Sequence, residues 1–280
     1  MERSELLEQM SQQGLGRLAD SLIQQARPSI RILTEPGEDA EIPVGASKFG
    51  GDPDLPEGFE WPEWNGEPLA FLAQISLADL LEFPEHELLP PNGLLSFFYD
   101  REQSTWGFDP EHRGSWRVVY HATEMLRRTS PPTPVPDEAM FDTCGISFEG
   151  GLAIPGWELL DHERLQFTDE EQSAFFEVMQ GTEGMEHHLF GYAHEIQGEM
   201  STECQLVSNG VYCGSGDPLS TPEGKRLAPG AKDWRLLLQL DSDDSVGWMW
   251  GDCGRLYFWI REEDLKARRF ENCWMILQCA

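Results

Sequence analysis

The chain has 280 residues, of which 40% are hydrophobic, and it contains 10 tryptophans and 15 phenylalanines. This apolar content is enough for a sizeable core and excludes a wholly disordered chain. The 50 acidic residues outnumber the 20 basic ones, which gives a formal net charge of −30 spread along the whole chain. A field of this sign repels phosphate backbones, so we expect no nucleic-acid partner.

The start of the chain, MERSELLEQM, carries acids early, and no apolar run is long enough for a signal peptide or a membrane span. We therefore expect a cytoplasmic protein that does not associate with membranes. The six cysteines include no C-x-x-C pair, so the sequence predicts neither a zinc knuckle nor a thioredoxin-type motif. We expect free thiols, no metal and no cofactor.

Helices are predicted at two places. In residues 1–30 apolar side chains recur at helical spacing up to Pro28, with glycines interrupting the run, which predicts an N-terminal segment of two short helices. The sequence Thr-Asp-Glu-Glu at 168–171 is a capping box, and it predicts one central helix that ends at Gly181.

The other strongly hydrophobic segments are short, rich in aromatic and aliphatic residues and bounded by turn residues, which favours strands. These predicted strands are residues 68–76, 93–100, 115–121, 233–241, 254–260 and 273–279. The proline-rich stretch 127–138 cannot continue a strand ladder because proline lacks the amide donor, so we interpret it as part of a connector. The predicted fold class is α+β with mainly antiparallel sheet.

The first three predicted strands correspond in order to the last three. The correspondence aligns Gln74 with Gln239, Gly93 with Gly254, Phe97 with Phe258 and, upstream, Phe49-Gly50 with Phe190-Gly191. A second register, which matches Ile75 with Ile260, is also open. We predict an internal duplication of a strand meander, so that residues 31–280 form one domain of two similar halves, about 31–126 and 186–280, joined by a connector with a helix at 127–185.

Residues 187–200, HHLFGYAHEIQGEM, raise the question of a metal or catalytic site. His187 and His188 are adjacent, so they point apart on either a helix or a strand, and a turn would have to bring His194 round to them. In the predicted duplication none of the three histidines has a counterpart. We therefore favour exposed or hydrogen-bonded histidines over metal ligands.

The most site-like segment is DSDDSVGWMWGDCGR, residues 241–255, in which four acids lie near two tryptophans. It could form a pocket for a cation with an indole as the π face, but an acidic turn whose tryptophans plug the core is the favoured alternative. The predicted candidates for ligand or partner binding are Trp106, His187, His188, His194, Asp241, Asp243, Trp248, Trp250 and Asp252.

Gln74 and Gln239 lie inside otherwise apolar strands. A buried glutamine costs free energy unless both ends of its amide are bonded, so each either holds neighbouring backbone, which we favour, or faces a polar cleft.

The sequence contains no G-x-S-x-G elbow, P-loop or GxGxxG motif. Cys204 or Cys213 could pair with one of the histidines, but a buried inert cysteine is commoner.

Several long motifs occur in an order typical of one family. They are FGGDPDLPEGFEWP, PLAFLAQISL, GLLSFFYD with WGFDP, IQGEMSTECQLVSNGVYCG, DWRLLLQLDSDD and MWGDCGRLYFWIREEDL. From about residue 30 to its end the chain resembles the YwqG-like family, a bacterial domain of unknown function. The resemblance implies an α+β, mainly antiparallel fold without an established activity or catalytic residues, and for some relatives a link to toxin-immunity systems.

Two functions are compatible with these observations. The first is a bacterial cytosolic binding protein that recognises a protein partner or a small ligand across a groove between its halves. The ligand could be cationic, and the protein could have a role similar to that of a toxin-immunity protein. The second is a hydrolase or other enzyme that uses His, Asp, Glu or Cys residues near 187–252. The acidity, the duplication and the lack of a catalytic signature favour the first, while the oligomeric state is left open.

Overall fold

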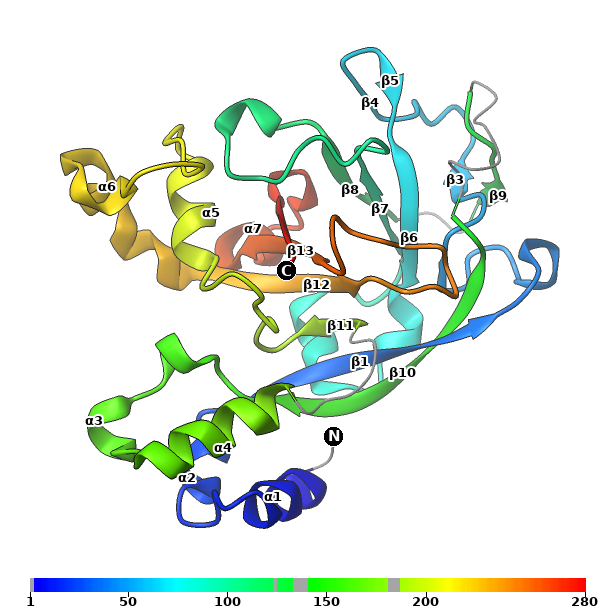
Figure 1. The fold of residues 1–280 in the computed structure, drawn as a ribbon. Coiled ribbons are helices and arrows are strands. Elements are labelled where there is room, and N and C mark those ends of the chain that lie inside the picture. Colours follow the sequence, from blue (N-terminus) through cyan, green and yellow to red (C-terminus); the bar gives the residue numbers. More distant parts are fainter. Residues whose placement is uncertain (1–2, 123–124, 133–140, 181–186) are drawn as a thin grey trace.

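The computed structural model describes residues 3–122, 125–132, 141–180 and 187–280. Within them the fold is α+β, with one antiparallel sheet of ten strands that curves almost into a barrel and two sheets of two strands (Figure 1). None of the helices in these ranges combines the length and the apolar character needed to cross a membrane.

The large sheet consists of two meanders that flank a central ribbon. Its strands, in spatial order, are β14 (Trp274–Gln278), β13 (Arg255–Arg261), β12 (Trp234–Asp241), β11 (His187–Phe190), β1 (Arg27–Pro36), β10 (Cys144–Ala153), β2 (Lys48–Phe49), β6 (Ala70–Ser76), β7 (Leu94–Tyr99) and β8 (Trp116–His121). The small sheets pair β3 (Asp54–Pro56) with β9 (Leu126–Arg128) and β4 (Glu63–Trp64) with β5 (Glu67–Pro68).

All six strands predicted from hydrophobic segments are confirmed. The prediction missed β10, which lies in the predicted connector and pairs with β1 over its whole length. Its sequence, CGISFEGGLA, contains three glycines and little continuous apolar surface, and both features weaken a strand signal. Residues 127–128, expected in the connector, belong to β9, and the prolines at 134 and 136 lie outside the described residues.

The helices are α1 (Arg3–Gln12), α2 (Ala19–Ile23), α3 (His162–Leu165), α4 (Asp169–Gln180), α5 (Ser201–Val207), α6 (Pro222–Leu227) and α7 (Glu262–Lys266). The two N-terminal helices and the central helix α4 are confirmed. The capping box forms as predicted, because Thr168 N donates to Glu171 Oε2 at 3.0 Å and Glu171 N donates to Thr168 Oγ1 at 3.2 Å. Gly181, the predicted stop of α4, lies outside the described residues.

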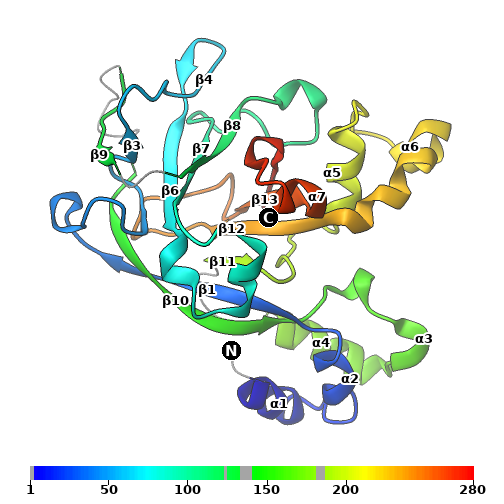
Figure 2. The ribbon, with the colours of Figure 1, turned by 180° about the vertical axis from the view of Figure 1, so that it is seen from behind.

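The first four helices form a module with its own hydrophobic core. Its buried side chains include Leu6, Met10 and Leu22 from the N-terminal segment and Phe175 from α4. Arg17 Nε donates to Glu171 Oε1 at 2.9 Å and so joins the two parts. Figures 1 and 2 both show the module at one end of the β1–β10 ribbon, away from the β6–β8 meander.

The two meanders have matching irregularities. The β6–β7 pairing shifts between Phe71 and Ala73, and the β12–β13 pairing shifts between Leu236 and Leu238. The strand next to each meander also pairs with a glutamine, because Lys48 of β2 faces Gln74 and His188 of β11 faces Gln239.

Counted from these two pairs, Gly50 corresponds to Phe190, and both have a left-handed backbone, with φ of 58° and 59°. The predicted match instead pairs Phe49-Gly50 with Phe190-Gly191, one residue away from this count.

Gln74 and Gln239 are fully buried, and each holds neighbouring backbone. Gln74 Oε1 accepts a hydrogen bond from Asp54 N at 2.8 Å, and its Nε2 donates to Ala46 O at 2.8 Å. Gln239 Oε1 accepts from His194 N at 2.9 Å. In each half, a strand amide thus fixes the path of an irregular segment.

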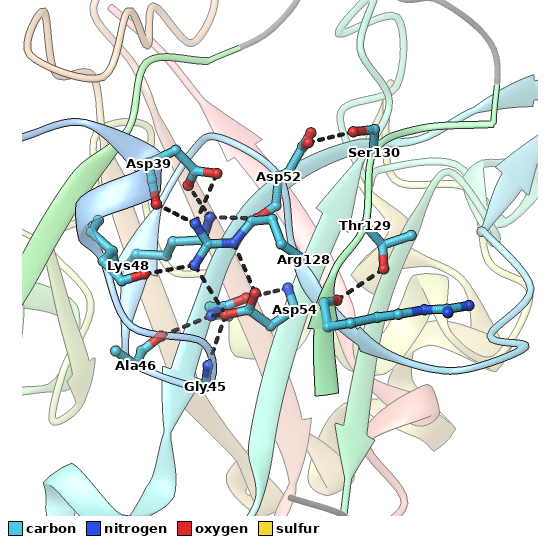
Figure 3. A network of polar contacts seen from close by, with 12 residues as sticks. Asp39, Gly45, Ala46, Lys48, Asp52, Asp54, Arg128, Thr129 and Ser130 are labelled. Carbon is cyan, nitrogen blue, oxygen red and sulfur yellow. Dashed lines mark hydrogen bonds and ion pairs between the residues drawn. The ribbon is translucent and has the colours of Figure 1, made fainter. Parts of the chain in front are cut away.

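A buried charge network surrounds the Gln74 end of the sheet (Figure 3). Lys48 is fully buried and donates to Asp39 Oδ1, and burial lowers the pKa of its ammonium group. Arg128 Nε donates to Asp54 Oδ1 at 2.8 Å, and its Nη1 lies 2.9 Å from Asp39 Oδ2. Burial opposes the ionisation of Asp54, but hydrogen bonds from Arg128 and Gln74 outweigh it and lower the pKa. The network ties β9 and the 39–54 segment to the sheet.

Replacing Gln74 with leucine should lower the free energy of unfolding by about 2–4 kcal/mol, because the buried Asp54 N–H and Ala46 C=O lose their partners. Urea unfolding measures this change. The matched control is Gln12→Leu at an exposed position of α1, which should change stability by less than about 0.5 kcal/mol. Equal effects of the two substitutions would contradict the assignment.

Candidate functional site

A cavity of about 370 Å³ opens between the β7–β8 loop, the short 3-10 turn η6 (Trp157–Leu159), the segment leading into α5, and strand β14. Its aromatic and polar lining includes Trp106, Phe108, Glu158, Glu199, Glu203 and Gln278. We call it the acid–aromatic pocket. It is lined from both predicted halves, because the aromatic residues follow β7 whereas β14 is the last strand of the second meander.

Gln278 of β14 positions one wall of the pocket. Its Oε1 accepts hydrogen bonds from Ile196 N at 2.9 Å and Gln197 N at 3.0 Å, and its Nε2 donates to Gly198 O at 3.0 Å. Residues 195–199 have no regular structure, so these bonds take the place of a strand ladder. They fix the segment from which Gln197, Gly198 and Glu199 line the pocket.

The β7–β8 loop forms the aromatic wall because it is bonded along β14. Leu277 N donates to Trp106 O at 3.1 Å, and Trp274 Nε1 donates to Gly107 O at 2.8 Å. Gly107 has a φ of 91°, and a Cβ atom there would stand 2.1 Å from Met275 O. Only glycine allows this close approach, which brings Trp106 against the strand.

The pocket concentrates negative charge. Glu158, Glu199 and Glu203 line it, and Glu199 and Glu158 also add to the effect of burial in raising the pKa of Glu195, which lies outside the lining, to about 8. Burial also raises the pKa of Glu203 to about 7, again with a contribution from Glu199. Within the described residues no lysine, arginine or histidine lines the pocket to offset these carboxylates.

The lining can therefore stabilise a positive charge. Carboxylates attract it directly, and the faces of Trp106 and Phe108 can contact a cation through their π electrons. The described part of the chain contains no group of three or more His, Cys, Asp or Glu side chains arranged to hold a metal ion. The arrangement suits an organic cation with an apolar part.

The family described as "Domain of unknown function (DUF1963)" matches residues 47–279. The chain belongs to this family. No curated protein matches the chain. The DUF1963 match contains both meanders and every side chain of the acid–aromatic pocket, and it begins after α1, α2 and β1.

In this DUF1963 chain two predicted site histidines are buried and hydrogen-bonded. His187 Nε2 lies 3.1 Å from Asp243 Oδ2, and its Nδ1 accepts from Asp241 N at 3.0 Å. His188 Nδ1 lies 2.9 Å from Phe190 O. These contacts join β11 to the end of β12 and to the turn that follows it.

His194 lies close to His188, with ring centroids 5.2 Å apart. Burial lowers the pKa of both imidazoles to about 4, so both are neutral at pH 7. The structure therefore brings these two histidines together, but in the interior and outside the acid–aromatic pocket.

The predicted tryptophan turn packs into the core. Trp248 and Trp250 are both 0% exposed, and Trp250 Nε1 donates to Asp241 O at 3.1 Å. Asp241 pairs with Arg255 at 3.0 Å, and Asp252 lies exposed on the surface. Both tryptophans therefore plug the core, which was the favoured interpretation of this turn.

Of the predicted candidates, Trp106 lies in the acid–aromatic pocket. Sequence reasoning missed Glu195, Glu199 and Glu203, although their four-residue spacing is a signal that would place them on one face of a helical segment. α5 begins only at Ser201, and Glu199 accepts from Thr202 N at 3.1 Å near its start. The buried strands and Gln278 also position these carboxylates, and the local sequence pattern does not reveal such contacts.

The substitution Glu203→Gln should stabilise the protein at alkaline pH. The pKa of Glu203 is raised to about 7 in the folded state, so its protonated form favours folding and this contribution is lost as pH rises through 7. Glutamine mimics the protonated form, and the gain should grow between pH 5 and pH 9 to roughly 1–2 kcal/mol.

Urea unfolding at both pH values measures this gain. The matched control is Glu102→Gln, at an exposed carboxylate on the β7–β8 loop, which should leave the pH dependence unchanged. The same pH dependence for wild type and Glu203→Gln would refute the raised pKa.

Proposed function

We propose that this protein is a binding protein whose acid–aromatic pocket takes an organic cation, namely the ammonium or guanidinium group of a small ligand or of a basic partner protein. One observation carries the proposal. Burial and repulsion from Glu199 raise the pKa of the lining residue Glu203 to about 7, in a pocket whose described lining has three carboxylates, Glu158, Glu199 and Glu203, and no cationic side chain. A bound cation would relieve this repulsion.

Two further features support a cationic ligand. Trp106 and Phe108 offer aromatic faces beside the carboxylates. The net charge of −30 would speed the encounter with a cation or a basic protein. The pocket also agrees with recognition across a groove between two halves, because both supply its walls.

An enzyme is the second candidate, favoured by one observation. A carboxyl group with a pKa near 7, as at Glu203, suits general acid–base chemistry. The expected nucleophiles give less support, because burial raises the pKa of the Cys204 thiol well above its usual value and that of Cys213 to about 11.

We also infer that the two halves arose by duplication. The support is a set of equivalent bonds: the Gln74 and Gln239 amides each accept from a backbone N–H, Ser76 N donates to Ser47 Oγ at 2.8 Å, and Asp241 N donates to His187 Nδ1 at 3.0 Å. The first strands of the two copies would then be β1 and β10. Each pairs with the second strand of the other copy, β11 or β2.

The YwqG-like name, the bacterial source, the cytoplasmic location and the immunity role stay predictions from the sequence.

Isothermal titration calorimetry with agmatine and spermidine tests the binding proposal. At physiological salt, which screens diffuse attraction, wild type should bind both amines and the neutral analogue 1,4-butanediol should give no heat. Glu203→Gln and Trp106→Ala should each weaken binding about tenfold or more.

The control Glu102→Gln removes the same charge outside the pocket and should bind as wild type does. If Glu102→Gln and Glu203→Gln bind the amines equally, the binding is diffuse and the proposal is wrong. If Trp106→Ala retains full affinity, the aromatic wall has no part in it.

A further inference from the structure

A second cavity, of about 320 Å³, lies where the start of β1, the 3-10 turn η3 (Pro84–Leu88), the end of β11 and the start of β12 meet. Its lining includes two acids, two arginines and apolar side chains, namely Glu85, Glu87, Arg27, Arg235, Leu88, Phe190 and Leu236. It shares no lining residue with the acid–aromatic pocket.

Glu85 is the informative side chain in this cavity. It is only 8% exposed, and its carboxylate forms no hydrogen bond or ion pair with any residue that the structure describes. Its carboxylate oxygens are not among the buried polar atoms that lack a partner, so they reach the solvent in the cavity. A cationic group of a ligand in the cavity can therefore pair with them.

Two arginines also line the cavity, and they differ. Arg235 is engaged, because its Nε donates to Glu262 Oε2 at 2.9 Å. Arg27 stacks on the ring of Tyr192, with its Cζ 4.3 Å from the centroid, and it has no ion pair within the described ranges. Stacking leaves the N–H groups at the edge of a guanidinium available for an anion.

The apolar part of the lining includes Phe190 and Leu236. Phe190 has a φ of 59°, in the left-handed region that disfavours a residue with a Cβ atom. The next residue, Gly191, has no room for a side chain, because a Cβ atom would stand 2.8 Å from Ser29 Cβ. This tight backbone fixes the Phe190 ring at the cavity.

We propose that this cavity binds a small zwitterion with an apolar body, namely an α-amino acid with an apolar side chain. Its ammonium group pairs with Glu85, its carboxylate with Arg27, and its side chain packs against Phe190 and Leu236. A primary amine alone would leave Arg27 unused, and a carboxylic acid alone would leave Glu85 without a partner.

Calorimetry on the full chain tests this with three related probes: L-leucine, 3-methylbutylamine, which lacks the carboxylate, and 4-methylpentanoate, which lacks the ammonium. Leucine should bind, and each analogue should bind about tenfold or more weakly. Glu85→Gln should weaken leucine binding to a similar extent. Arg27→Gln should weaken leucine binding but leave the amine unaffected.

Glu82→Gln, at an exposed carboxylate just before η3, is the matched control and should bind leucine as wild type does. Glu203→Gln should do the same, which separates this site from the acid–aromatic pocket. The proposal is wrong if leucine gives no heat up to about 10 mM, if Glu85→Gln binds leucine normally, or if the amine binds as tightly as the amino acid.

Discussion

The three hydrogen bonds of Gln278 are the interaction on which the acid–aromatic pocket depends. The amide lies in a buried strand and satisfies the backbone of a segment without regular structure, so neither side is left unpaired in the interior. Through them Glu195 and Glu199 are held where their charges repel one another. The same device recurs at Gln74 and Gln239, which hold the segments at Asp54 and His194. Buried amides on strands thus shape the irregular parts of this fold.

A pocket of this kind lowers the stability of the free protein. Burial raises the pKa values of Glu195 and Glu203, so these two carboxyl groups tend to keep their protons near neutral pH. Most of the 50 acids of the chain can instead ionise in contact with solvent. Charge strain of this type is typical of sites that gain their partner from a ligand. The network at Lys48 shows the contrast, because there Asp39 and Arg128 offset one another within the chain.

The sequence predicted the elements with strong local signals. The six hydrophobic strands and the capping box at Thr168 are examples, because periodicity and cap chemistry act over a few residues. It missed β10, whose glycines weaken the local strand signal and which is stabilised by pairing with β1 and β2. For Trp248 and Trp250 it left a site open but favoured rings that plug the core, and the fold buries both rings. The pocket escaped prediction because Gln278 and Gly107 act across distant segments, through contacts that local patterns do not encode.

The most direct test of the account is an NMR titration of the Glu203 carboxyl carbon, with and without saturating agmatine. The account predicts a pKa of about 7 in the free protein, set by burial and by Glu199, and a fall towards the ordinary value of 4.5 when the cation is bound. A pKa near 4.5 in the free protein, or a raised value that agmatine leaves unchanged, would contradict it.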